Sequence, residues 1–106
     1  MAESTGRVTV AQQVLDTIVQ LTTLNVPGVA RLGARSALRR GGDGVQVDVA
    51  DNHVNVEVYV IVQPEVNMRE VGKTIQSEIA RAMKEMVGMD VSTVNVHIQD
   101  VEAAAG

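Results

Sequence analysis

The strongest constraint on the fold of this chain is an alternation of valines in the middle of its 106 residues. Valine occupies every second position from Val45 to Val49, and again from Val54 to Val62. A period of two puts such residues on one face of a β-strand and the intervening residues on the other. Asp51-Asn52, between the two runs, are turn-forming residues. The stretch therefore predicts a β-hairpin with one buried face.

A first helix is predicted upstream of the hairpin, over residues 10–25. Thr9 and Gln12 have the spacing of a capping box, T-x-x-Q, which satisfies free N–H groups at the start of a helix. Pro27 and Gly28 end the helix, because proline lacks an N–H group and glycine tolerates a positive φ. The apolar stripe that this helix would bury consists of Val14, Leu15, Ile18, Val19 and Leu21.

A second helix is predicted downstream of the hairpin, over residues 68–87. Asn67 and Glu70 form a pair like a capping box before it, and Gly88 suits a left-handed C-cap. Gly72 in the first turn is expected to allow the close approach of another backbone segment. The apolar face of this helix holds Val71, Ile75, Ile79, Ala82, Met83 and Met86.

A last strand is predicted over residues 91–100, where Val94, Val96 and Ile98 alternate with polar residues. The two helical stripes need an apolar surface, and the valine face of the sheet is their natural partner. The second helix is long enough to lead to a parallel last strand. We therefore predict an α+β fold, a two-layer α/β sandwich. Two amphipathic helices pack on one face of a small mixed sheet of three to four strands, in the order helix, hairpin, helix, strand.

Some local alternatives remain open. Residues 7–10 could add a short N-terminal strand. Residues 29–32 fit another short strand, and residues 34–40 fit one or two helical turns before a glycine-rich loop. We expect a single domain over residues 7–101, with flexible tails at residues 1–6 and 102–106.

Composition narrows the functional classes. The chain has no cysteine, which excludes disulfides, thiolate metal sites and a cysteine nucleophile. Its formal net charge of −4 at pH 7 disfavours nucleic acid or an anionic membrane as the main partner. No apolar run reaches the roughly 18 residues that a membrane-spanning helix needs. The first residues also lack the pattern of a signal peptide. We expect a cytoplasmic protein without a membrane span.

The sequence contains no combination of residues that indicates an enzyme. His53 and His97 stand apart from each other and from any H-E-x-x-H spacing. The serines do not fall in a G-x-S-x-G elbow, and there is no phosphate-binding loop or dinucleotide fingerprint. We therefore expect no catalytic residues, no cofactor and no metal site.

The sheet face that points away from the helices is the first candidate for a binding surface. We expect it to present Tyr59 and Ile61 from the hairpin, and Asn95 and His97 from the last strand. Tyrosine combines a large apolar body with one polar tip and is enriched at interfaces. An exposed strand edge is a second candidate, because its unpaired N–H and C=O groups can accept a further strand. Both predict a protein partner.

A nucleic-acid-binding site is the alternative prediction. Arg35, Arg39 and Arg40 precede the run from Gly41 to Gly44, which spells the G-x-x-G loop by which KH domains clamp a nucleic-acid backbone. A KH loop joins two helices, whereas this loop enters a strand, and Asp43 would repel phosphate. The alternative therefore ranks below a protein partner.

Several short motifs follow one another along the chain: V-P-G-V at residues 26–29, the hairpin, G-M-D-V at residues 88–91 and V-N-V-H-I at residues 94–98. In combination they resemble the alkaline shock protein family, small envelope stress response proteins found mainly in Gram-positive bacteria. The resemblance covers residues 6–101. The chain departs from the family at Gln63-Pro64-Glu65, where members often have Tyr-Gly.

The resemblance implies a non-enzymatic role, and the family has no catalytic residues to transfer to this chain. Members are similar to cytoplasmic scaffold proteins that lie beneath the cell membrane. Some are held there by a separate membrane-anchored protein, and some self-associate. For this chain the resemblance implies a scaffold linked to envelope or alkaline stress. It would bind a membrane-anchored protein at the inner face of the membrane and form homo-oligomers.

Overall fold

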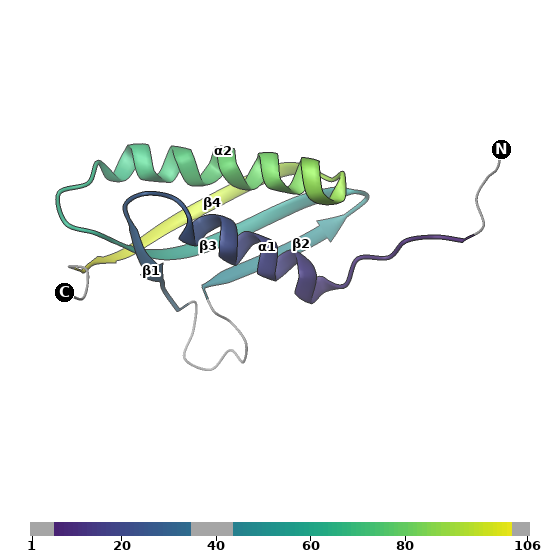
Figure 1. Ribbon diagram of the computed structural model, residues 1–106, viewed down its shortest axis with the longest axis horizontal. Helices are drawn as coiled ribbons and strands as arrows, with labels where there is room; N and C mark the ends of the chain where they lie inside the picture. Colours follow the sequence, from purple (N-terminus) through teal and green to yellow (C-terminus); the bar gives the residue numbers. More distant parts are fainter. Residues whose placement is uncertain (1–5, 35–43, 103–106) are drawn as a thin grey trace.

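The computed structural model describes residues 6–34 and 44–102 as two helices packed on a four-stranded sheet (Figure 1). The elements follow in the order α1 (Gln12–Leu24), β1 (Val29–Leu32), β2 (Val45–Ala50), β3 (His53–Val62), α2 (Met68–Val87) and β4 (Asp90–Val101). Both helices lie on the same face of the sheet and contact each other. This arrangement confirms the predicted two-layer α/β sandwich.

β3 is the central strand of the sheet. β4 pairs with β3 in parallel along its whole length, so β1 and β2 share the other edge of β3. There β2 pairs with residues 53–58 and β1 with residues 60–62, both antiparallel. The sheet is therefore mixed, as predicted, and α2 provides the crossover from β3 to the parallel strand β4.

The hairpin between β2 and β3 turns where the sequence predicts. Asp51 and Asn52 have φ values of 52° and 68°, and Ala50 pairs with His53 across the turn. A two-residue turn with positive φ at both positions matches the natural twist of the flanking strands, and Asp and Asn adopt it readily. The turn sets the register of the hairpin and so decides which valines face the helices.

The core lies between the sheet and the two helices. Val54, Val56, Val58 and Val60 of β3 are fully buried on the helical side. Ile75, Ile79 and Met83 of α2 are fully buried against them, and Leu15 and Val19 supply the contribution of α1. Because β3 is paired on both edges, it forms the centre of this apolar layer.

α2 begins and ends at the predicted residues. Asn67 Oδ1 accepts a hydrogen bond from the Glu70 N–H group at 3.1 Å, which caps the first turn. Gly88 has a φ of 73°, and its N–H group donates to the Lys84 carbonyl at 3.1 Å. Gly72, however, has open space where a side chain would start. The expectation of a close backbone approach at Gly72 is therefore wrong.

α1 departs from its prediction at the N-terminus. Its N-cap residue is Ala11, which makes no side-chain cap, so the predicted Thr9–Gln12 capping box does not form. Gln12 instead donates to the Val47 carbonyl of β2 at 2.8 Å, because the helix start lies against that strand edge. Residues 7–10 precede the helix without joining the sheet, so they do not form the alternative short N-terminal strand.

The buried side of α1 is also narrower than its apolar stripe. Leu15, Ile18 and Val19 face the core, whereas Val14 and Leu21 are 47% and 57% exposed. α1 contacts β1, β2 and α2, and its remaining side is left to solvent. The stripe predicted from the sequence therefore consists of two faces, only one of which is covered within the described residues.

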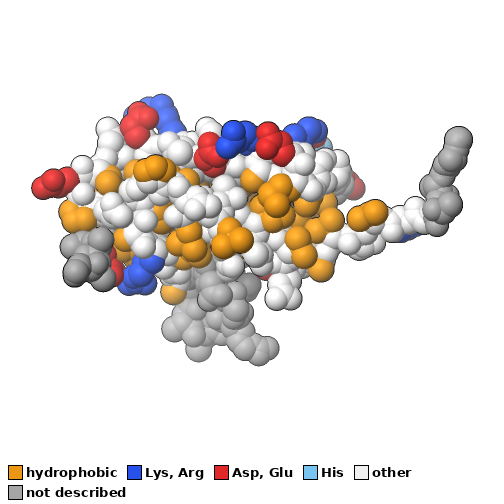
Figure 2. All heavy atoms as spheres, viewed as in Figure 1, with side chains coloured by type: hydrophobic (Ala, Val, Ile, Leu, Met, Phe, Trp, Pro, Cys, Tyr) orange, Lys and Arg blue, Asp and Glu red, His pale blue; other side chains and the backbone are white. Residues whose placement is uncertain are grey.

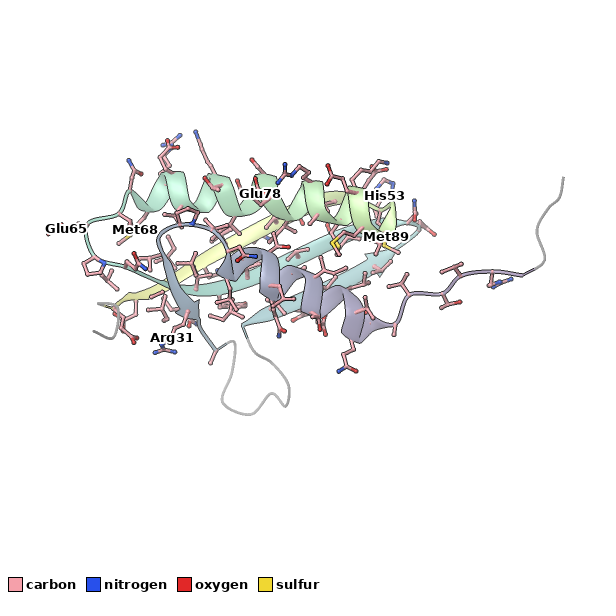
Figure 3. All side chains as sticks on the ribbon, viewed as in Figure 1. Arg31, His53, Glu65, Met68, Glu78 and Met89 are labelled. Atoms are coloured by element: carbon pink, nitrogen blue, oxygen red, sulfur yellow. The ribbon has the colours of Figure 1, made fainter. Side chains whose placement is uncertain are left out.

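The remaining local predictions have mixed outcomes. The strand at residues 29–32 is confirmed as β1, whereas the helical turns at 34–40 fall almost entirely outside the described residues. Glu102, which follows the predicted domain end at residue 101, contacts both β3 and β1. The N–H group of Glu102 donates to the Val62 carbonyl at 2.8 Å, and its carboxylate pairs at 2.9 Å with Arg31, which is labelled in Figure 3.

Candidate interaction face

The side of the sheet opposite the helices carries an ordered group of side chains, which we call the open face. It consists of Asn55, Glu57 and Tyr59 from β3 and Thr93, Asn95 and His97 from β4. The parallel register places each β3 residue beside one from β4: Asn55 beside Thr93, Glu57 beside Asn95, and Tyr59 beside His97. Since both described helices lie on the other side of the sheet, neither covers this group.

Glu57 is the centre of the open face. Its Oε2 atom accepts a hydrogen bond from Asn95 Nδ2 at 2.7 Å, and its Oε1 atom lies 2.6 Å from His97 Nε2. An ionised carboxylate can only accept, so Nε2 of His97 is the donor in this contact when Glu57 is charged. The contact becomes an ion pair when the imidazole is protonated on both nitrogens. Glu57 thus holds two side chains of the neighbouring strand in place.

Tyr59 and His97 form an aromatic pair next to this carboxylate. Their ring centroids are 4.5 Å apart and the ring planes differ by 12°, so the rings are stacked. The stack places the Tyr59 ring against His97, whose Nε2 atom is hydrogen-bonded to Glu57. At the other end of the face, Thr93 Oγ1 donates to Asn55 Oδ1 at 2.8 Å. Cross-strand pairs of this kind contribute about 0.2–1 kcal/mol each, so their main effect here is to fix side-chain positions.

Gln99 closes one end of the open face. Its side chain connects β4 to Ala34, just beyond β1, through two hydrogen bonds: Nε2 to the carbonyl at 2.8 Å, and Oε1 from the N–H group at 3.2 Å. A side chain at Gly33 would start 2.1 Å from Gln99 Oε1, so glycine is required there for this contact. The amide of Gln99 thus links the two outer strands at this end of β3.

Of the four residues predicted to form the binding surface, three are accessible. Asn95 and His97 are exposed and Tyr59 is partly exposed. The expectation that Ile61 is exposed is wrong: it is only 5% accessible and lies outside the main core cluster. Ile61 pairs with both β1 and β4, next to the end that Gln99 closes. Ile61 is therefore not available to a partner in the way that Asn95 and His97 are.

Sequence reasoning placed Glu57 on this face but did not select it as a site residue. The signal that could have found it is the register: an acid directly opposite an amide and diagonal to a histidine. Such a pairing is visible only once β3 and β4 are known to be parallel neighbours. The carboxylate then becomes the common acceptor of the face.

An ion pair lies where α2 leads into β4, at the edge between the helical layer and the sheet, which we call the rim. Lys84 Nζ is 3.0 Å from Asp90 Oδ1, and this hydrogen bond and charge lower the pKa of the Asp90 carboxyl below its ordinary value of 3.8. Desolvation opposes this shift, and a positive charge on His53 acts in the same direction as Lys84. His53 lies at the same end of the molecule as Met89, which follows α2 (Figure 3). The pair joins the helical layer to the sheet.

Most of the residues of the alternative nucleic-acid site, Arg35, Arg39, Arg40 and Gly41, lie outside the described residues. Gly44 is described, and it is buried at the entry to β2. Its φ is 75°, and a side chain there would start 2.7 Å from the Gly33 carbonyl oxygen and 2.9 Å from that of Tyr59. The geometry of the strand junction therefore accounts for glycine at this position.

Within the described residues there is no group of three or more His, Cys, Asp or Glu side chains that could hold a metal ion. None of the helices within residues 6–34 and 44–102 combines the length and the apolar character that crossing a membrane would require.

Solved structures with a similar fold include the MamM CTD in its copper form, with a TM-score of 0.58 and 11% identity over 89% of this chain and 90% of that one. The manganese form of a MamM CTD variant gives a TM-score of 0.55 and 11% identity over 92% and 89%. At this level of identity the likeness concerns the fold alone. It does not transfer the metals of those structures to this chain.

Sequence comparisons identify closer relatives. The Bacillus subtilis protein YqhY is 29% identical over 105 residues, which is 92% of this chain and 78% of the relative. A Streptococcus pyogenes protein, Spy1614, is 24% identical over 107 residues, 92% of this chain and 88% of the relative. Both are described as uncharacterized. The model of the alkaline shock protein family, described as having a cell envelope-related function, matches residues 1–103. The chain therefore belongs to this family, as the resemblance of its motifs predicted.

Proposed function

We propose that this chain is a non-enzymatic scaffold of the envelope and alkaline stress response, and that its open face binds a membrane-anchored protein on the cytoplasmic side. The cell envelope-related function of the family supports the cellular setting. The observation that carries the binding role is the ordered group around Glu57, Tyr59, Asn95 and His97. Polar groups and an aromatic pair are already fixed there on the uncovered side of a rigid sheet.

This order favours binding for an energetic reason. Each flexible side chain that a partner must immobilise costs about 0.5–1.5 kcal/mol. Glu57 already holds Asn95 and His97, and the stack restrains Tyr59, so a large part of that cost is met during folding. Tyrosine adds a broad apolar contact with one polar tip, which suits an interface between proteins. The open face thus offers a fixed pattern of donors and acceptors beside the stacked rings of Tyr59 and His97.

The outer edge of β4 is a weaker candidate than the face. β4 has 12 residues against 10 in β3, and the register shifts at Ser92 and Gln99. Bulges of this kind bend an edge strand and discourage the addition of another. Gln76 Nε2 of α2 also donates to the Val94 carbonyl at 3.0 Å and so occupies one main-chain acceptor of this strand. These features support binding through the face.

The experiment is a comparative pull-down with a double substitution, Tyr59→Ala with His97→Ala. The tagged chain is recovered from membrane and soluble fractions of its own cells, and copurifying proteins are quantified by mass spectrometry. We expect a protein with a membrane segment to copurify with the wild type, and its recovery to fall at least tenfold with the double variant. The double variant should still melt cooperatively, because the lost cross-strand pair contributes no more than about 1 kcal/mol.

The matched control is Lys73→Ala with Ser77→Ala, two exposed residues of α2 in the opposite layer. It removes a comparable number of side chains and should leave the recovery unchanged. Equal recovery with a folded Tyr59→Ala, His97→Ala variant would contradict the role of the open face. Recovery of RNA that nuclease treatment abolishes would instead favour the arginine–glycine segment.

A further inference from the structure

A groove runs along the surface where the two helices meet, and we call it the seam groove. It consists of two hollows, the first with a volume of about 380 Å³ and the second of about 330 Å³. Val14 and Leu21 of α1 line the first hollow, and Asn25 and Pro27, at the end of α1, line the second. Met86 of α2, which is 66% exposed, lines both. The two hollows therefore adjoin along one side of the helical layer.

The first hollow is mainly apolar. Its side chains Val14 and Leu21 belong to the side of α1 that the core leaves exposed. Figure 2 shows hydrophobic side chains gathered on this face of the molecule, next to a row of acidic and basic side chains. Exposed apolar surface with a polar border is typical of a place where another molecule docks. The apolar hollow alone, however, does not indicate which molecule that is.

The second hollow carries charge, which narrows the choice of occupant. Glu78, Arg81 and Glu85 of α2 line it, so it has two carboxylates against one guanidinium; Glu78 is labelled in Figure 3. Arg81 Nη2 lies 2.6 Å from Glu78 Oε1, so the guanidinium is already paired with that carboxylate. Glu85 has no ion-pair partner among residues 6–34 and 44–102. The charged side chains that line this hollow therefore give it a net negative charge.

The end of α1 adds to this negative potential. Its C-cap is Asn25, and its last turn contains no basic residue. The last carbonyl groups of a helix together carry about half a negative charge, which attracts cations. Because Asn25 lines the second hollow, this partial charge acts at the same place as Glu85. The basic residues Arg69, Lys73 and Lys84 of α2 line neither hollow. The second hollow therefore favours a positively charged group.

We propose that the seam groove binds an amphipathic helical segment of a partner protein, with apolar side chains in the first hollow and a lysine or arginine in the second. Val14 and Asn25 are eleven residues apart, about 16 Å along α1, which is the length of three helical turns. A helix of this length spans both hollows with side chains spaced three and four residues apart. Nucleic acid and anionic lipids fit less well, because Glu78 and Glu85 repel phosphate groups.

The seam groove is a second binding surface and does not depend on the first. It lies in the helical layer, opposite the open face, and the two share no residue. A scaffold with both surfaces holds one protein on the sheet and another on the helices at the same time. The variant Leu21→Asp should therefore leave the recovery of a membrane-anchored protein through the open face unchanged. Each proposal can fail while the other stands.

The first test selects binders of the full chain from a random peptide library on phage, with peptides of about twelve residues, slightly more than three helical turns. We expect the enriched peptides to combine apolar residues at helical spacing with lysine or arginine. They should bind Leu21→Asp, which puts a charge into the apolar hollow, at least tenfold less tightly than wild type. The matched control is Leu24→Asp, at a leucine of the same helix that is 44% exposed and lines neither hollow. It should bind like the wild type.

The second test measures the contribution of charge with one enriched peptide, by isothermal titration calorimetry. Glu85→Lys reverses the charge at the second hollow and should weaken binding at least tenfold. Glu70→Lys changes the net charge of the same helix equally but lies outside the groove, and it should weaken binding less than twofold. Both residues are exposed, so circular dichroism should show that both variants fold.

Four results would overturn the proposal. One is a library that yields no enriched peptide, and another is a set of enriched peptides without basic residues. The third is equal binding of the peptides to Leu21→Asp and Leu24→Asp, or to the two lysine variants. The fourth is self-association of the wild type that Leu21→Asp abolishes, because a second copy would then occupy the groove. Peptide binding that is lost in the folded variant Tyr59→Ala, His97→Ala would likewise contradict it, since the peptides would then bind the open face.

Discussion

The two faces of the sheet use the same strand for different purposes. On the helical side, Val54, Val56 and Val58 of β3 are fully buried, and any apolar side chain of similar volume would serve. On the open face, Glu57 and Tyr59 take defined partners on β4, and their identity decides which atoms are presented. The stability of the fold therefore depends mainly on the helical side of the sheet. The pattern of donors and acceptors that a partner could meet depends on the open face.

The largest expected effect comes from a charge on the covered face. Val56→Asp removes about 2 kcal/mol of apolar burial and places a carboxylate where it has no water, at a cost of several kcal/mol more. Domains of this size are stable by about 5–15 kcal/mol, so we expect the variant to lose cooperative unfolding in circular dichroism. Asn55→Asp, one residue away on the open face, is the control and keeps the acceptor for Thr93. A cooperative transition of Val56→Asp near that of wild type would refute the distinction between the faces.

A second prediction compares two glycines. Gly44→Ala forces a side chain into a left-handed position, at about 1–2 kcal/mol, and brings it within 3.0 Å of two carbonyl oxygens that belong to the backbone. We expect a loss of about 2–4 kcal/mol in urea unfolding. Gly72→Ala, by contrast, meets open space inside a helix and should add about 0.5–1 kcal/mol. Changes of the same sign at both positions would contradict this account.

The hairpin and α2 could be predicted closely because their signals are local. Asp51-Asn52 allows the positive φ values of the turn, and Asn67 and Gly88 cap α2 at the expected residues. The prediction of α1 was less accurate because tertiary contacts override its local signals. Gln12 bonds to the Val47 carbonyl instead of closing a capping box, and apolar residues lie on two sides of the helix. A single stripe was therefore inferred where there are two faces.

The candidate site was predicted in part for a related reason. Period-two alternation correctly placed Tyr59, Asn95 and His97 on one face. The contacts of Glu57, however, depend on the register between β3 and β4, which follows from irregularities at two points along β4. The alternation also places Ile61 on the face of Tyr59, but it does not show that Ile61 is buried. Long-range register of this kind is not encoded in any local pattern.

A third prediction concerns a polar side chain that is buried within the helical layer. Thr23 of α1 is fully buried, and within the part of the chain that the structure describes its Oγ1 atom has no hydrogen-bond partner. Thr23→Val keeps the shape and removes the buried hydroxyl, whose desolvation costs about 1–3 kcal/mol. We expect a gain of about 1 kcal/mol in unfolding free energy. The control is its partly buried neighbour, and Thr22→Val should change stability by less than about 0.5 kcal/mol.

The smallest expected effect lies at the rim between the two layers, in the exposed pair of Lys84 and Asp90. The pKa of Asp90 is lower in the folded chain than its ordinary value of 3.8, so the pair contributes stability above about pH 4. That contribution is lost as the pH falls through the folded-state pKa. Asp90→Asn should therefore be slightly less stable than wild type at pH 6, with the difference vanishing near pH 2.

Two measurements separate this small electrostatic effect from packing. Lys84→Gln should reproduce the pH dependence of Asp90→Asn, because either change breaks the same contact. Salt of about 1 M, where the screening length is about 3 Å, should remove most of the difference at pH 6. A difference that persists at pH 2 or in high salt would show that Asp90 acts through the geometry of the α2–β4 junction. The Lys84–Asp90 contact would then stabilise the fold through packing, as the buried valines of β3 do, and not through charge.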